Sequence, residues 1–377
     1  MQNIYLDNAA TTPIDTDVIK VITKTMETTF GNPSSTHQFG RKSKSLVETA
    51  RKNIASHFNV SASEIVFTSG GSEADNLILI NAVVNLNVKR IISSKIEHHA
   101  VTHTLTYLQK NYQTKIEFVK ITNSGEIDYA HLNQLLGNTD EKTLVSLMYV
   151  NNEIGTLLDL EKVCKLCSEN QALFHSDTVQ AIGHFIINLQ KTPLDFITAS
   201  AHKFHGPKGV GFAIIKKGFG IKPILLGGAQ ERGARAGTEN VPNIAGMEFA
   251  LTKSLKNLTT EKKYILALKQ YFINELKSNF KTIRFNGISE DLEKSSYIIL
   301  SVRFAKELPM LLFSLDLKGI AVSGGSACQS GSSKGSHVLS AILNTNEALQ
   351  SSVRFSFSKN NTKEELDYVI KTLKELV

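Results

Sequence analysis

The stretch Val66-Phe-Thr-Ser-Gly-Gly-Ser-Glu-Ala-Asp-Asn76 predicts a short strand, a tight glycine turn and the beginning of a helix. Such a junction leaves backbone N–H groups free and directs the positive end of the helix dipole outward, which suits a phosphate group. Gly70 and Gly71 allow close approach, and Ser72 can donate its hydroxyl or cap the helix. An ordinary strand-to-helix turn has the same pattern, and the dinucleotide motif G-x-G-x-x-G is missing. The turn alone leaves both interpretations open.

Apolar, β-branched segments recur along the chain and alternate with helical patterns, at residues 65–68, 90–93, 144–150, 173–175 and 195–198. Continuous apolar strands separated by helices predict an α/β fold with a mostly parallel sheet, whose ligand site lies at the carboxyl ends of the strands. From about Asn257 a charged helical stretch reaches Phe280, and shorter strands and helices follow. We therefore predict a large domain over residues 15–256 and a smaller α+β domain made of residues 1–14 and 257–377.

The hydrophobic content, net charge and cysteine count of the chain limit the classes of protein to which it can belong. The 377 residues are 41% hydrophobic, enough for a large core. The net charge is +7, yet Lys and Arg are dispersed and no finger spacing or ribonucleoprotein motif is present, so we expect no direct nucleic-acid partner. No apolar run follows a basic start, and no span reaches about 18 apolar residues, so no membrane partner is expected. Three cysteines cannot form a disulfide framework, which favours a cytoplasmic location.

An acid and an amine follow two of the predicted strands. One strand ends in Asp177 and a later one ends at Lys203, which places both groups at the same sheet edge. Desolvation there can lower the pKa of a lysine and free its amine for a Schiff base. A single lysine is ordinarily a solvated surface group. Together, however, the lysine, the carboxylate and the glycine turn match pyridoxal phosphate, whose aldehyde, pyridine nitrogen and phosphate need those three partners.

Other candidates are individually ambiguous. His98 follows the strand at 90–93, so it can stack on a planar cofactor or move protons, or it can be an ordinary histidine. His99 and His103 have the spacing of metal ligands but no evident third ligand. Cys164 and Cys167 lie in a predicted helix, where core packing is the favoured interpretation.

Two further candidates lie near the C-terminus. In the alternating segment 351–358, Arg354 can fork onto a carboxylate ligand, although pairing with an acidic side chain is commoner. Cys328 lies in the Gly/Ser-rich run 323–337, a composition that predicts a mobile loop. A mobile thiolate suits a nucleophile that collects an atom at a buried site and passes it to a partner. The alternative is a surface loop with an incidental cysteine.

Over essentially its full length the chain resembles the cysteine desulfurases, of the pyridoxal-phosphate-dependent class V aminotransferase superfamily. The resemblance rests on motifs in the family's order at residues 5–13, 31–35, 68–73, 97–98, 150–155, 177 with 180, 200–203, 235–240 and 325–328. It implies a fold-type I transferase with pyridoxal 5'-phosphate as cofactor.

The resemblance also implies roles for single residues. Lys203 would carry the cofactor, Asp177 would pair with its pyridine nitrogen, and His98 would stack on its ring. The remaining implied positions are Gln180 and Asn152 on the ring-oxygen side, Gly71, Ser72, Ser200 and His202 at the phosphate, Thr238 at the phosphate of the neighbouring subunit of a homodimer, and Arg354 with Asn152 at the substrate.

The implied reaction converts L-cysteine to L-alanine. Lys203 would remove the Cα proton, the Cys328 thiolate would take the sulfur as a persulfide, and His98 is the candidate proton donor. The sulfur would pass to an acceptor protein, an iron–sulfur scaffold or a thiolation protein. Three departures from the family pattern are Gly71-Ser72 in place of Ala-Thr, Lys334-Gly335 in place of Glu-Pro, and a chain that stops at Val377 without a scaffold-docking tail. The acceptor therefore stays open.

Rival functions share parts of this pattern. A pyridoxal-phosphate-dependent cysteine or cystine lyase, or a selenocysteine-preferring enzyme, would keep the cofactor site without needing Cys328. A noncatalytic scaffold could keep the fold, but the joint presence of Lys203, Asp177, His98 and Cys328 argues against it.

Overall fold

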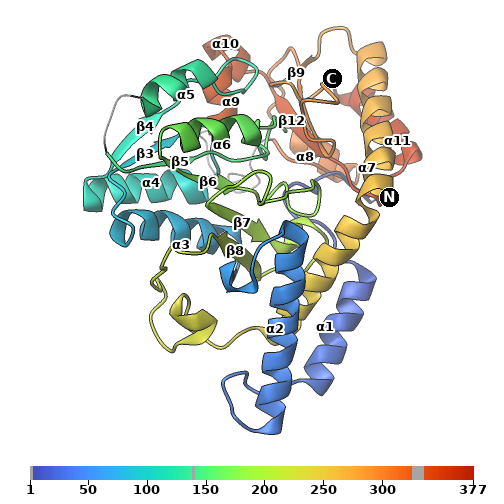
Figure 1. Cartoon of the computed structure of the whole chain (residues 1–377). Coiled ribbons are helices and arrows are strands. Elements are labelled where there is room, and N and C mark those ends of the chain that lie inside the picture. Colours follow the sequence, from blue (N-terminus) through green and yellow to red (C-terminus); the bar gives the residue numbers. More distant parts are fainter. Residues whose placement is uncertain (1–2, 138–140, 325–334) are drawn as a thin grey trace.

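The computed structural model describes residues 3–137, 141–324 and 335–377, and its centre is a seven-stranded sheet (Figure 1). In spatial order the strands are β2 (Ile65–Thr68), β8 (Gly211–Ile215), β7 (Phe196–Ser200), β6 (Leu173–Asp177), β5 (Thr143–Ser146), β3 (Arg90–Ser93) and β4 (Lys115–Phe118). Strand β8 runs antiparallel to both of its neighbours, whereas the other neighbouring pairs are parallel. The predicted α/β fold with a mostly parallel sheet is confirmed.

Helices cover both faces of this sheet, which explains why the side chains of its strands other than β4 are almost all buried. Successive side chains of a strand point to opposite faces. In β3, Ile91 accordingly joins the apolar cluster beneath α3 (Gly71–Val84) and α4 (His99–Tyr112), whereas Ile92 joins the larger cluster on the opposite face. That larger cluster includes residues of α2 (Gln38–Phe58), α5 (Tyr129–Leu136), α6 (Leu160–Glu169) and α7 (Val241–Asn279).

The C-terminal part of the chain is an α+β unit. Its antiparallel sheet has the order β12 (Ser352–Ser356), β10 (Ile299–Arg303) and β9 (Arg284–Phe285). Strand β11 (Ile320–Ala321) pairs in parallel with β1 (Ile4–Tyr5), so the N-terminal residues lie beside the C-terminal part. The helices of this unit are α8 (Leu311–Leu317), α9 (His337–Ile342), α10 (Thr345–Ala348) and α11 (Lys363–Leu376).

Helix α7 begins earlier than the sequence prediction. It runs unbroken from Val241 to Asn279 beside α1 (Thr16–Thr28) and α2 and on toward the C-terminal unit, so it crosses the predicted boundary at residues 256 and 257 (Figure 1). The division into domains stays a prediction.

Two local features of the large sheet bear on the site. Strand β5 ends at Ser146, earlier than the predicted segment, but the N–H groups of Leu147 and Tyr149 still donate to carbonyls of His175 and Asp177. The chain therefore continues along β6 toward residue 152. On α6, Cys164 and Cys167 are both buried, which confirms their predicted core packing. Among the described residues, no helix combines the length and apolar character that a membrane crossing requires.

Candidate functional site

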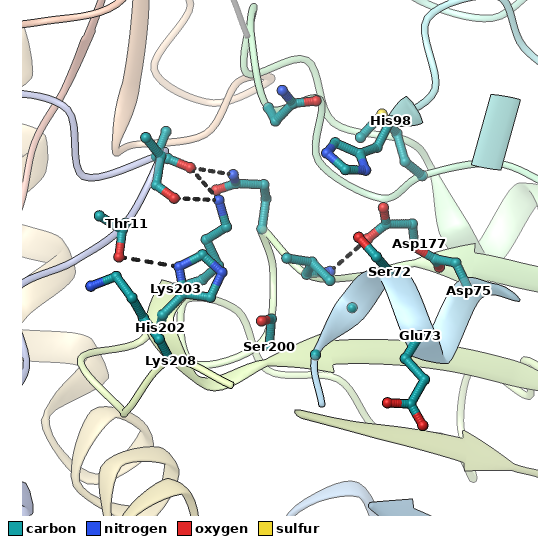
Figure 2. A pocket seen from close by; sticks show the side chains of 18 of the residues that line it. Thr11, Ser72, Glu73, Asp75, His98, Asp177, Ser200, His202, Lys203 and Lys208 are labelled. Atoms are coloured by element: carbon teal, nitrogen blue, oxygen red, sulfur yellow. Dashed lines mark hydrogen bonds between the residues drawn. The ribbon is translucent and has the colours of Figure 1, made fainter. Parts of the chain in front are cut away.

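A cavity of about 480 Å³ opens at the carboxyl ends of the central strands. Residues of the loops after β2, β3, β5, β6 and β7 line it, together with residues 9–11 and Arg354 of β12. Figure 2 shows Lys203, His98, Asp177, Ser72 and Ser200 around this common space. The sequence-predicted residues that line the cavity are Gly71, Ser72, His98, Asn152, Asp177, Gln180, Ser200, His202, Lys203 and Arg354. Thr238 lines a smaller neighbouring pocket, and Cys328 lies outside the described residues.

The glycine turn after β2 forms a narrow cradle at the beginning of α3. Gly70 has a φ of 155°, and no side chain at this position caps the helix. A Cβ on Gly71 would lie 2.5 Å from Cγ2 of Val179, so a larger residue does not fit without movement. The N–H groups of the first turn of a 14-residue helix therefore face the cavity beside the hydroxyls of Ser72 and Ser200. This arrangement suits a phosphate.

Lys203 closes a single 3₁₀ turn that follows β7 directly. Its Nζ donates to the carbonyls of Ala9 at 2.6 Å and Ala10 at 2.8 Å, and its own carbonyl accepts a hydrogen bond from Nε2 of His184 at 2.9 Å. Gln180 also donates to the Ala9 carbonyl, at 2.8 Å. The N-terminal segment thus packs against the lysine turn and fixes the direction of its amine.

Asp177 is a buried carboxylate at the end of β6, and its Oδ1 accepts the N–H of Val179 at 2.9 Å. Burial, reinforced by the charge of nearby Asp75, raises the Asp177 pKa to about 6. Asp75 is also buried, which raises its own pKa to about 7, and it lies 3.4 Å from Nε2 of His175. Buried carboxyl groups of this kind favour a cationic partner, as a protonated pyridine nitrogen would be.

The two histidines of the site are held neutral near pH 7. Burial lowers the pKa of His98, and Lys203 adds to that effect while Asp177 opposes it. Nδ1 of His98 accepts the N–H of Ala100 at 3.1 Å, so its proton resides on Nε2. Burial, with Lys203 and Lys208 nearby, lowers the pKa of His202 to about 4.

Arg354 combines both sequence interpretations, since it lines the cavity and also pairs with an acid. Its side chain is 2% exposed. Nη2 lies 2.8 Å from Oδ1 of Asp7, and Nη1 donates to the carbonyl of Asn152 at 2.8 Å. Asp7 also accepts the hydroxyl of Ser323 at 2.8 Å. The antiparallel C-terminal sheet is thereby joined to the cavity.

Several residues at the site have no role in the sequence interpretation, namely Asp7, Glu73, Asp75, Met148 and Lys208. Asp75 lies within the segment 66–76, four residues after Gly71 and therefore on the same helical face. That spacing is a sequence signal that could have placed Asp75 at the site. For Asp7 the pairing of β1 with β11 brings it to Arg354, and no local pattern predicts such a contact. The rings of His99 and His103 stack at 4.8 Å, but no group of three metal-ligating side chains is found in the described part of the chain.

The comparisons with known proteins cover nearly the whole chain. The family model described as Aminotransferase class-V matches residues 4–369. A protein of Dictyoglomus turgidum named Cysteine desulfurase IscS is 38% identical over 381 residues, covering 100% of this chain and 95% of that protein.

Solved structures agree in fold. That of a NifS-like protein superposes with a TM-score of 0.91 at 34% identity and covers 99% of each chain. The structure of SspA in complex with cysteine has a TM-score of 0.77 at 26% identity, covering 95% of this chain and 100% of that one. Because each match spans almost the entire chain, the similarity includes both the large sheet and the C-terminal unit.

Proposed function

The chain belongs to the class V aminotransferase family, and from this premise we propose that it is a cysteine desulfurase which binds pyridoxal 5'-phosphate and converts L-cysteine to L-alanine. The observation that carries the proposal is the convergence of Lys203, Asp177 and the glycine turn in one cavity. These groups lie on three separate strand ends, and each matches a different part of the cofactor.

The residues present fit this cofactor. The amine of Lys203 would hold it covalently, Asp177 would face its pyridine nitrogen, and the turn at Gly71 with Ser72, Ser200 and His202 would hold its phosphate. Gln180 and Asn152 would face the ring-oxygen side. When bound, the cofactor supplies an electron sink for the negative charge that develops at the substrate Cα.

The chain's own residues then position the substrate and move its protons. Arg354 and Asn152 would orient the L-cysteine carboxylate, because a guanidinium matches the fork of a carboxylate. Lys203 would remove the proton from Cα, with its backbone held by His184 and its amine directed by the carbonyls of Ala9 and Ala10. Nε2 of His98 is the proposed proton donor, because Nδ1 is occupied as an acceptor.

Sulfur transfer is assigned to Cys328. Its thiolate attacks the substrate sulfur, an S–S bond forms, and the C–S bond breaks. The electron pair of that bond passes to the substrate carbon, which takes a proton to become alanine. Two hydrogen bonds support this assignment. The described residues that flank the segment containing Cys328 form them close to the cavity. Ser323 donates to Asp7 at 2.8 Å, and Nε2 of His337 donates to the carbonyl of Glu97 at 2.9 Å.

The partners follow from the same proposal. The persulfide sulfur would pass to an acceptor protein, an iron–sulfur scaffold or a thiolation protein, in a cytoplasmic setting. A homodimer is proposed because the family resemblance implies that Thr238 binds the phosphate of the neighbouring subunit. Consistent with this proposal, Thr238 lines a separate pocket beside the cavity. Large apolar side chains such as Phe30, at 71% exposure, and Leu226, at 83%, also fit burial against a second copy.

The test is to incubate the purified protein with L-cysteine and a thiol reductant, and to follow alanine, sulfide and the visible spectrum. Cys328→Ala is compared with Cys164→Ala, which removes a buried thiol from α6. We expect a yellow wild type and a yellow Cys164→Ala that release both products, and a yellow Cys328→Ala that releases almost no sulfide. A colourless protein would refute the cofactor assignment. A yellow and equally active Cys328→Ala would favour a lyase that needs no thiol.

A further inference from the structure

A carboxylate lies beside the cradle that we assign to phosphate. Glu73 is on the first turn of α3, and Figure 2 shows it on the side of that turn away from Lys203. Its Oε2 accepts the N–H of Ser69 at 2.8 Å. Burial opposes its ionisation, but hydrogen bonds from Arg235 and Ser69 outweigh burial and lower the Glu73 pKa. The negative charge of Glu73 therefore lies within one helical turn of the proposed phosphate position. This charge would repel the negatively charged phosphate of the cofactor.

Arg235 compensates this charge directly. Its Nε lies 2.8 Å from Oε1 of Glu73, and its Nη2 lies 3.4 Å from Oε2, so the guanidinium forks onto the carboxylate. Both side chains are mostly shielded from solvent, with 22% exposure for Arg235 and 16% for Glu73. Salt and water screen a shielded ion pair less than an exposed one. Arg235 therefore offsets the charge of Glu73 effectively at the place where the phosphate would bind.

The backbone that carries Arg235 is held in a strained conformation. Glu231, Arg232 and Gly233 have consecutive φ angles of 47°, 58° and 83°. Left-handed backbone at the first two costs free energy and persists only where other contacts enforce it. Here Glu231 is buried and pairs with Arg51 at 2.7 and 2.8 Å. The same carboxylate accepts the N–H of Phe67 at 2.9 Å.

Glu231 and Glu73 therefore both accept hydrogen bonds from the backbone of the segment that runs from β2 into the glycine turn. Glu231 binds the backbone of Phe67 in β2, and Glu73 binds the backbone of Ser69, where the glycine turn begins. Arg235 follows Glu231 by four residues in the chain and bonds to Glu73. The loop of residues 231–235 is thus built around the strand that leads into the cradle.

We propose that Arg235 is a positioning residue for phosphate recognition. By pairing with Glu73 it cancels the carboxylate charge next to the cradle and keeps that carboxylate on the N–H of Ser69, which leaves the N–H groups of the first turn of α3 to the phosphate. The inference rests on the proposed pyridoxal-phosphate function and deepens it. It assigns to Arg235 the preference for the phosphorylated cofactor over its unphosphorylated form.

The test compares pyridoxal phosphate with pyridoxal, which lacks only the phosphate. Cofactor-free protein is titrated with each, and Kd is read from the visible absorption band, with no activity involved. Arg235→Gln should raise the Kd for pyridoxal phosphate at least tenfold and that for pyridoxal less than threefold. Arg232→Gln is the matched control, since Arg232 is half exposed and bonds to Glu48 instead. Its two Kd values should match those of the wild type.

The double variant Glu73→Gln/Arg235→Gln removes both charges and should regain most of the lost affinity. If Arg235→Gln alone does not fold, the Kd values of the two ligands can still be compared in the double variant, because this variant leaves no charged side chain without a partner. Equal losses for both ligands, or no recovery in the double variant, would overturn the proposal and leave Arg235 a structural role. A wild type that binds pyridoxal phosphate while Arg235→Gln binds it equally well refutes this inference alone. A wild type that binds no pyridoxal phosphate refutes the proposed function itself.

Discussion

The substitution Gly71→Ala tests whether the glycine turn is the phosphate cradle. A Cβ at this position would meet Cγ2 of Val179 at 2.5 Å, well inside van der Waals contact, and Cβ of Val179 at 3.7 Å. Valine has few χ1 rotamers, so its methyl cannot simply swing aside. The N–H of Val179 is also the donor to Oδ1 of Asp177, so a displaced Val179 disturbs the carboxylate assigned to the pyridine nitrogen.

The expected magnitude follows from this contact. Overpacking by one methyl in a closely packed site costs about 1–3 kcal/mol. The free protein can relax by shifting α3, but the complex cannot, because the N–H groups of that helix have to meet the phosphate. The cost should therefore fall on binding, and at about 1.4 kcal/mol per factor of ten it amounts to roughly 5- to 150-fold weaker affinity for pyridoxal phosphate.

The assay is titration of cofactor-free protein with pyridoxal phosphate, with Gly137→Ala as control. Gly137 lies at the end of α5 with a φ of −74°, and a Cβ there meets nothing closer than 3.5 Å, so its affinity should match the wild type. Val179→Ala removes the clashing methyl, so Gly71→Ala/Val179→Ala should bind within about threefold of Val179→Ala alone. Unchanged affinity in Gly71→Ala, or no rescue by Val179→Ala, would refute the reasoning.

Three further predictions concern stability and substrate binding. Burial lowers the pKa of Lys269 to about 7, so between pH 7 and 9 the unfolded chain binds more protons than the folded one. The free energy of unfolding should therefore rise by about 2 kcal/mol over that interval in the wild type relative to Lys269→Met, measured by urea denaturation at both pH values. Arg354→Lys keeps the charge but loses the fork, so the KM for L-cysteine in alanine production should rise about tenfold while the visible band of the bound cofactor stays unchanged. His184→Ala removes the donor to the Lys203 carbonyl and should lower the free energy of unfolding by about 1–3 kcal/mol in the same denaturation assay.

The parts of the fold that the sequence predicts are those with a local signal. The strands at 65–68 and 90–93 match β2 and β3 to the residue, and every side chain in both strands is buried. The direction of β8 has no such signal, since a strand buried on both faces has the same pattern in a parallel or an antiparallel position. The early start of α7 had one: Asn240 caps the helix and Pro242 follows at its beginning.

The candidate site divides in the same way. Asp177, Lys203, His98 and the glycine turn were predicted to converge because parallel strands bring their carboxyl ends to one edge. The pairing of Arg354 with Asp7 depends on contacts between the two ends of the chain, which no periodicity encodes. Cys328 lies outside the described residues, so its role as nucleophile stays a prediction.

The N-terminal segment explains how residues so far apart in the chain form one site. Strand β1 places it beside β11, and from there Asp7 reaches Arg354 and Ser323. Two and three residues later, the carbonyls of Ala9 and Ala10 accept the amine of Lys203. The proposed substrate-carboxylate group, the proposed cofactor amine and the residue that leads into the Cys328 segment therefore all bond to one stretch of four residues. A substrate carboxylate bound at Arg354 would meet Asp7 on the same guanidinium, and this shared contact would couple substrate binding to Ser323, the residue that leads into the proposed thiol segment.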